Sequence, residues 1–400
     1  MVSEEMLLLG RKRFVIRDIF SMAQQRKAVV GDENVFDFSI GNPNVPVPHQ
    51  VKEAIEDMIN TMPDVDIHGY SNASGFEDVK QTVIDHINTV YHRKYETKDL
   101  FLTCGAAAAL TIALRALVNP GEEVMVIAPH YPEYPSFIQS ARGKTVIVPH
   151  DPEAMQINFE AFEKLLTEKT KAVIVNSPNN PSGAVYTEET IKRLADLLKE
   201  RSEEYGHPIY IVSDEPYREI VFDGWKVPYI PDYYTDTLIC YSYSKSLSLP
   251  GHRIGYLLMP YDSTSIEDIR TAVPGAARIL GFVQAPAFAQ RIIQRCVDVL
   301  ADMKLYENNR DLFYGTLSQY GFQCIKPQGA FYLFMKSPDE DVEKFVENGR
   351  KYNLFYAPGE DFGCPDYVRI SFCIAPETIQ KSLPLFEKLA NDYHLKGGTK

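Results

Sequence analysis

The chain has 400 residues, of which 45% are hydrophobic and 24% are charged, and its formal net charge is −13. These values are ordinary for a globular protein, and the length makes two domains the expectation. The acidic balance argues against a nucleic-acid partner, because such binding depends on Lys and Arg meeting phosphates. No apolar run approaches the length of a membrane span, so no membrane partner is expected.

The cysteine pattern and the first residues indicate a cytoplasmic protein. The six cysteines are scattered without a Cys-x-x-Cys pair, which is typical of a reduced protein without a zinc or other metal site. Charges follow the short apolar run near the start, unlike a secretory signal. Residues 1–30 are amphipathic, and they predict either an arm that lies on a partner subunit or a surface helix.

The middle of the chain predicts an α/β fold. Between about residues 95 and 260, short apolar strands alternate with helical patterns, which indicates a mostly parallel sheet flanked by helices. Beyond residue 290 the pattern predicts a hairpin around 330–335 and a last helix from Pro376, after a long helix over 287–300. The strands expected in the sheet are 123–127, 144–148, 172–175, 209–213 and 238–241.

Two turns in the first half of this region are candidate binding segments. Gly105 opens a helical pattern whose first residues are Ala106 and Ala107. Free N–H groups at such a helix start can bind phosphate, although plain packing is the alternative. Tyr131 follows the strand over 123–127, where its flat side chain can stack on a ring or simply close the edge of the core.

Two strand ends in the second half carry ionisable side chains. Asp214 directly follows the strand over 209–213. A buried carboxylate is unstable as an ion unless a cation lies beside it. Its alternative role is a helix N-cap, because Glu215 and Pro216 follow. Lys245 follows the strand over 238–241 in the pattern Ser-x-Ser-Lys, and Pro-Gly-x-Arg253 comes next. The alternative for Lys245 is a solvated lysine.

Arg369 lies in the alternating, strand-like stretch Asp366-Tyr-Val-Arg-Ile-Ser. An arginine buried there needs a carboxylate, which its planar fork grips through two parallel hydrogen bonds. The alternative is an arginine on an edge strand that faces water.

Together these segments resemble the signature of the class I and II aminotransferases, which have fold type I and use pyridoxal 5′-phosphate (PLP). The resemblance includes the loop from Asn176 to Gly183, with Ser177 at a usual proline and Ser182 at a usual threonine, and it spans nearly the whole chain. It implies a large domain with a mostly parallel seven-stranded sheet and a smaller α+β domain. The implied division is 1–48 for the N-terminal arm and part of the small domain, 49–290 for the large domain and 291–400 for the small one.

The resemblance also implies site roles. Lys245 would form the Schiff base with PLP and move protons, Asp214 would keep the cofactor ring protonated, and Tyr217 would bind the ring hydroxyl. Asn180 would bind the ring oxygen and the substrate carboxylate, and Tyr131 would stack on the ring. The remaining implied contacts are to the phosphate, from Ala106, Ala107, Ser242, Arg253 and a partner subunit's copy of Tyr70, and to the substrate, from Gly41, Arg369 and a neighbouring subunit's copy of Arg278.

The implied activity is transfer of an amino group from an L-amino acid to a 2-oxo acid such as 2-oxoglutarate, by a ping-pong mechanism in a homodimer. Arg278 favours aspartate or another acidic donor, because a second carboxylate needs a second cation; a surface arginine on a helix is the alternative. A PLP-dependent carbon–sulfur lyase is the second interpretation, because it shares these motifs. A PLP-sensing regulator is the least favoured, since the scaffold starts within the first few dozen residues.

Overall fold

The computed structural model describes residues 2–11, 15–151 and 155–395. Its largest element is a seven-stranded sheet in the order β2-β8-β7-β6-β5-β3-β4, in which β8 is antiparallel to both of its neighbours. The strands are Leu100–Thr103 (β2), Glu123–Ile127 (β3), Lys144–Val148 (β4), Thr170–Asn176 (β5), Tyr210–Asp214 (β6), Thr237–Ser242 (β7) and Gly255–Leu258 (β8). The predicted fold class is confirmed. The bounds of β3 and β4 are those expected, and β5, β6 and β7 differ by one or two residues.

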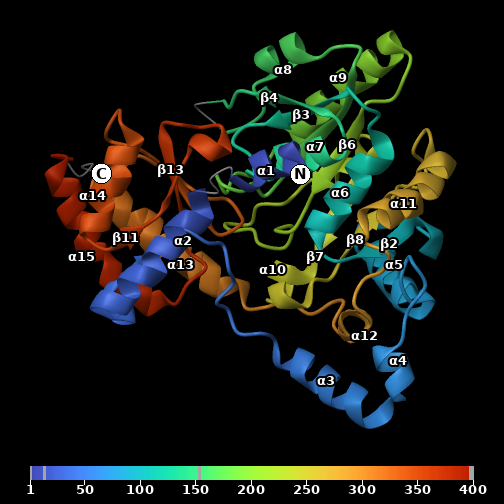
Figure 1. Ribbon diagram of the computed structural model, residues 1–400, viewed down its shortest axis with the longest axis horizontal. Coiled ribbons are helices and arrows are strands. Elements are labelled where there is room, and N and C mark those ends of the chain that lie inside the picture. The colour runs from blue at the N-terminus through green and yellow to red at the C-terminus, as the bar shows by residue number, and fades with distance from the viewer. Residues whose placement is uncertain (1, 12–14, 152–154, 396–400) are drawn as a thin grey trace.

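Helices cover both faces of this sheet (Figure 1). Alternate residues of β3 point to opposite faces, with Val124 and Val126 in one core cluster and Met125 and Ile127 in another. The first face packs on α6 (Ala106–Leu117), α7 (Tyr134–Ser140) and α11 (Ile266–Leu280). The second packs on α8 (Phe159–Leu165) and α9 (Glu188–Tyr205) over the middle strands, and on α3 (His49–Thr61), α5 (Glu77–Tyr91) and α12 (Ala287–Arg295) over β2, β7 and β8. Every residue of β2, β6, β7 and β8 is buried, and burial on both faces explains their mostly apolar sequences, whereas the edge strand β4 is partly exposed.

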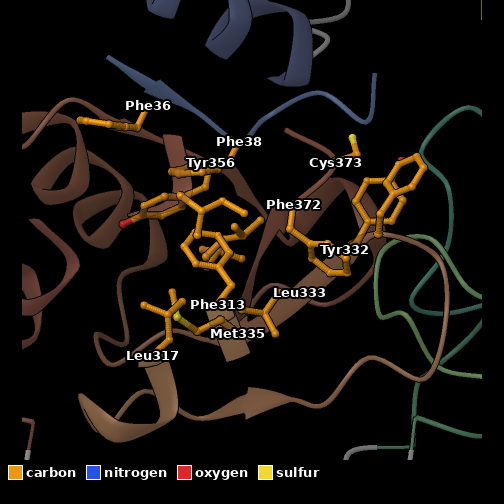
Figure 2. Packing of buried hydrophobic residues seen from close by; sticks show 14 of the residues in the cluster. Phe36, Phe38, Phe313, Leu317, Tyr332, Leu333, Met335, Tyr356, Phe372 and Cys373 are labelled. Atoms are coloured by element: carbon orange, nitrogen blue, oxygen red, sulfur yellow. The ribbon is translucent and has the colours of Figure 1, made fainter. Parts of the chain in front are cut away.

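A second, antiparallel sheet belongs to the C-terminal part of the chain. Its order is β12-β13-β10-β9, with Cys324–Ile325 (β9), Tyr332–Lys336 (β10), Ala357–Pro358 (β12) and Tyr367–Ser371 (β13). Helices α13 (Met303–Gln319), α14 (Val342–Lys351) and α15 (Pro376–Asp392) accompany it. Figure 2 shows the core of this part, where Phe38 packs beside Tyr356, Phe372 and Phe313. The last helix begins at Pro376, as expected, and β9 and β10 form the expected hairpin.

The N-terminal segment packs on this C-terminal part. Strand β1 (Phe36–Asp37) pairs in parallel with β11 (Leu354–Phe355). Helix α2 (Val15–Val30) buries Ile16, Ile19 and Ala23 in a cluster with Phe355 and Phe362. Figure 1 shows α2, in blue, beside the orange and red C-terminal elements. Helix α1 (Glu4–Arg11) contains no buried residue, and its Glu5 accepts a hydrogen bond from Gln139 of α7.

The long helix expected over 287–300 ends early, at Arg295. Val297 and Val299 are β-branched, which lowers helix propensity, and both pack sideways against the core cluster beneath α3, α5 and α12. Asp302 then caps α13 by accepting a hydrogen bond from the N–H of Lys304. The segment in between therefore serves as the connection from the large sheet to the C-terminal part.

The six cysteines are free thiols in the structure. Within residues 2–11, 15–151 and 155–395, no helix is long and apolar enough to cross a membrane. The same described residues contain no group of three or more side chains arranged to hold a metal ion.

Candidate active site

A cleft of about 370 Å³ opens where β5, β6 and β7 end and the C-terminal sheet approaches. In an open α/β sheet, ligands bind at this edge of the strands. Every site residue expected from the sequence lines the cleft except Tyr70 and Arg278. The expected residues that line the cleft are Gly41, Ala106, Ala107, Tyr131, Asn180, Asp214, Tyr217, Ser242, Lys245, Arg253 and Arg369.

Lys245 lies in α10 (Tyr243–Ser246), directly after β7, and its Nζ donates a hydrogen bond to the carbonyl oxygen of Gly41 at 2.8 Å. Nζ also lies 5.3 Å from the centre of the Phe331 ring. Burial lowers the pKa of Lys245 to about 8, and Arg253 and Arg369 act in the same direction. The alternative of a solvated lysine is therefore wrong: this amine is held in a largely apolar cleft and loses its proton easily.

Asp214 is the last residue of β6, and its side chain is buried. Oδ2 accepts a hydrogen bond from the hydroxyl of Tyr134 at 2.6 Å, whereas Oδ1 is buried without a hydrogen-bond partner. Burial raises the pKa of Asp214 to about 7, against the lowering effect of Tyr134. The N-cap alternative is wrong, because turns follow Asp214. A buried carboxylate oxygen with no partner fits a ligand that brings a protonated nitrogen.

Arg369 of β13 meets Asn180, which lies in the turn after β5. Arg369 lies on β13, between β10 and β12, and only 2% of it is exposed, so the edge-strand alternative is wrong. Its Nη1 donates to Oδ1 of Asn180 at 3.0 Å, its Nη2 donates to the carbonyl oxygen of Ser39, and its buried Nε has no partner. The guanidinium carbon lies 4.7 Å from the centre of the Tyr332 ring and 4.8 Å from that of Phe362. A buried arginine with spare donors fits a carboxylate ligand.

A phosphate cradle lies at the start of α6. Gly105 precedes the helix with φ of +88°, and a Cβ there would come within 2.9 Å of Nη2 of Arg253. Arg253 is fixed by hydrogen bonds from its guanidinium to the carbonyl oxygens of Cys104 and Pro250. Ala106 and Ala107 in the first turn of α6, Arg253 and Ser242 all line the cleft. The combination fits a phosphate dianion, and the positive φ of Gly105 favours glycine at the start of this helix.

Two tyrosines complete the walls. The Tyr217 hydroxyl shares a hydrogen bond of 3.0 Å with the hydroxyl of Tyr332, and burial raises the pKa of Tyr217. The half-buried Tyr131 packs edge-on against Tyr134, with 5.6 Å between ring centres. Both aromatic rings therefore have fixed orientations at the cleft.

Two residues that support this site, Tyr134 and Asn176, were not among those expected from the sequence motifs. Tyr134 holds Asp214, as described above. Asn176, at the end of β5, donates from Nδ2 to the carbonyl oxygen of Asp214 at 2.8 Å and accepts from the N–H of Asn180 at 2.8 Å. Two sequence features could have identified these residues. Asn176 stands at the end of a predicted strand, and Tyr134 follows Tyr131 by three residues.

Tyr70 and Arg278 lie outside the cleft of their own chain. Tyr70 is 94% exposed, after α4 (Asp64–His68), and Arg278 is exposed near the end of α11. Among the described residues, Arg17 of α2 is a further cation that lines the cleft, together with Ile16, Ile40 and Glu133. Because Arg278 was expected to act from a neighbouring subunit, its place outside the cleft of its own chain does not test that role, and it stays a prediction.

Comparisons with known proteins agree with this geometry. A model of the class I and II aminotransferases matches residues 33–383. A probable aspartate aminotransferase of Methanocaldococcus jannaschii is 31% identical, over 94% of this chain and 97% of the relative. An aromatic-amino-acid aminotransferase of Thermococcus litoralis is 27% identical, over 95% and 96%. The crystal structure of an amino transferase from Eubacterium rectale is 45% identical and matches 98% of this chain and 99% of that one, with a TM-score of 0.96.

The residues of the cleft fit PLP: an unpartnered carboxylate oxygen for the ring nitrogen, a glycine-opened helix for the phosphate, and a lysine with a lowered pKa. The family model covers most of the chain, and one relative exceeds 30% identity over nearly its full length. The chain therefore belongs to the class I and II aminotransferases, and it is a PLP-dependent transaminase.

Proposed function

We propose that this transaminase takes its amino group from an acidic L-amino acid such as aspartate and passes it to a 2-oxo acid such as 2-oxoglutarate in two half-reactions. The observation that carries the proposal is the pair of arginines that line one cleft, the buried Arg369 and the exposed Arg17. A substrate with two carboxylates needs two such cations. The name of the Methanocaldococcus jannaschii relative supports the same donor.

Each predicted site residue that lines the cleft has a proposed role in the reaction. Bound PLP supplies an electron sink for the charge that develops at the substrate Cα. Lys245 takes the proton from that carbon and later returns one, which its lowered pKa favours near neutral pH. Arg369 and Asn180 hold the α-carboxylate, with Gly41 beside it, and Asp214 keeps the ring nitrogen protonated. The other ligands of the cofactor are Ala106, Ala107, Ser242 and Arg253 at the phosphate, and Tyr131 and Tyr217 at the ring.

An aromatic donor is the second candidate. Ile16, Leu110 and Phe137 give the cleft apolar walls. The carboxylate of Glu133 would repel the side-chain carboxylate of an acidic substrate bound near it. The name of the Thermococcus litoralis relative supports this alternative.

Mixing the PLP form with a panel of amino acids tests the donor. We expect aspartate or glutamate to bleach the cofactor absorbance fastest. Arg17→Met should lower the reactivity toward them about 10- to 100-fold, the range for one lost charged hydrogen bond, and should leave apolar donors nearly unchanged. Arg26→Met, on the same helix but bonded to Asn353, is the matched control. Fastest reaction with phenylalanine or tyrosine, and no effect of Arg17→Met, would favour the aromatic candidate instead.

We also propose a homodimer in which Tyr70 reaches the cleft of the partner. Tyr70 is almost fully exposed, although the loop that carries it is well anchored. Gln290, itself fully buried, accepts from the N–H of Phe76 at 2.8 Å and donates to Oγ of Ser71 at 3.1 Å. A closed two-fold dimer is the commonest soluble assembly, and it would give each site residues from both chains.

Subunit exchange tests this arrangement. Tyr70→Ala and Lys245→Ala homodimers are each expected to be nearly inactive. A mixed dimer has one site with both changes and one with neither, so random mixing should restore about a quarter of wild-type activity, after subtraction of the residual Tyr70→Ala rate. If sedimentation shows exchange and no activity returns, Tyr70 does not act across an interface.

The proposed domain division is 1–48 and 291–400 around the small sheet, and 49–290 around the large one. The pairing of β1 with β11 and the packing of α2 on Phe355 and Phe362 support the assignment of the first residues to the small domain.

A further inference from the structure

The hydroxyl of Tyr134 donates a hydrogen bond to one of the two carboxylate oxygens of Asp214. Tyr134 is 1% exposed, at the start of α7, and donates to Oδ2 at 2.6 Å. Its ring is fixed by the rings of His130 and Tyr131, with centres 6.3 Å and 5.6 Å away. Burial and the neighbouring Asp214 raise the pKa of Tyr134 well above its ordinary value, so this hydroxyl keeps its proton and remains a donor.

The two oxygens of Asp214 are therefore not equivalent. Oδ2 accepts from Tyr134, whereas Oδ1 is buried without a partner in a side chain that lines the cleft. The backbone carbonyl of Asp214 is held as well, by Nδ2 of Asn176 at 2.8 Å. With the main chain fixed and Oδ2 already accepting from Tyr134, Oδ1 is the carboxylate oxygen that still lacks a hydrogen-bond partner.

We propose that Tyr134 is a positioning residue that directs Oδ1 of Asp214 at the cofactor ring nitrogen and determines which carboxylate oxygen shares the proton with it. The proposal rests on the proposed role of Asp214. When PLP is bound, Oδ1 would hold the proton of the ring nitrogen, with the negative charge on the carboxylate and the positive charge on the ring. Tyr134 keeps its own proton throughout and stabilises the carboxylate that results.

The variant Tyr134→Phe removes one oxygen atom and keeps the packed ring. The matched control is Tyr234→Phe, because Tyr234 is also buried and donates to the carbonyl oxygen of Ile209, just before β6, at 2.7 Å. Tyr134→Phe loses one hydrogen bond, and Tyr234→Phe loses two, the bond to Ile209 and one of 3.3 Å shared with Oγ of Ser202, but only Tyr134→Phe loses the bond to the carboxylate.

The first measurement is the pKa of Asp214 in the cofactor-free protein, followed by NMR of ¹³C-labelled aspartate carboxyls. The wild-type value should lie near 7. Loss of a donor to the charged form raises an acid's pKa, so Tyr134→Phe should shift it upward by about one unit, and Tyr234→Phe should leave it unchanged. Equal values in all three proteins would overturn the proposal.

The second measurement is a double-mutant cycle on PLP affinity at neutral pH. Tyr134→Phe should weaken binding about tenfold in the wild-type background and have no further effect in an Asp214→Asn background. Equal losses in both backgrounds would show that Tyr134 does not act through Asp214. If Asp214→Asn itself changes neither affinity nor turnover, the proposed role of Asp214 fails, and the pKa shift still reports the Tyr134 contact separately.

If Tyr134→Phe does not fold, the wild-type protein supplies a further readout. The ¹³Cζ signal of Tyr134 should move with the same pH midpoint as the carboxyl of Asp214, because the two groups share a hydrogen bond. A Tyr134 signal that stays constant through that titration contradicts the proposal.

Discussion

Replacing Lys245 by alanine should lower turnover by at least about 10²- to 10⁴-fold, the range for a lost general acid–base group. The cleft should still bind PLP, because the phosphate cradle around Gly105 and the carboxylate of Asp214 remain. Steady-state rates and equilibrium dialysis of PLP measure the two effects separately.

Lys80→Ala is the matched control, since Lys80 is also a buried lysine but is paired with Glu77, outside the cleft. Its activity should remain close to that of the wild type when its stability allows folding. Near-normal activity of Lys245→Ala would contradict the proposed active site as a whole.

Replacing Asp214 by asparagine should lower the rate of the proton-transfer step by about 10²- to 10³-fold, the usual cost of removing one electrostatic group at a reacting centre. The shape is kept, and the hydroxyl of Tyr134 can still donate to the amide oxygen. The amide NH₂ then faces the ring nitrogen and favours its unprotonated form, which is a poorer electron sink. Single-turnover rates measure this step, and PLP affinity should fall much less.

Asp236→Asn is the control for the loss of a buried carboxylate. Asp236 accepts hydrogen bonds from Ser263 and Thr264 and precedes β7, at the edge of the sheet away from the cleft. Its single-turnover rate should not change. An unchanged rate in Asp214→Asn would mean that another group protonates the ring.

The large sheet and the ends of its strands were predictable from the sequence, because burial on both faces leaves a clear pattern in the strands. Strands buried on both faces are continuously apolar, and Asn176, Asp214 and Ser242 stand where these apolar runs stop. Because β5, β6 and β7 are parallel neighbours, the ends of these strands share one edge of the sheet. The order of motifs along the chain then placed Lys245 and Asn180 at that edge.

Other features depend on contacts that local patterns do not contain. Arg369 reaches the cleft from a separate sheet, and Tyr134 meets Asp214 across 80 residues of sequence. Arg17 lies in a helix whose amphipathic pattern fits an arm or a surface helix equally well, and its place at the cleft follows from the packing of α2 on Phe355. The motifs are shared with lyases, so the transaminase assignment came from the family comparison.

The most direct test of the active site is reduction of the PLP form with borohydride, followed by digestion and mass mapping. The reduction makes the bond between cofactor and lysine permanent. The proposed site predicts one labelled peptide, which contains residue 245, and no label in Lys245→Ala. Label on any other lysine, or equal labelling of Lys245→Ala and the wild type, would contradict it.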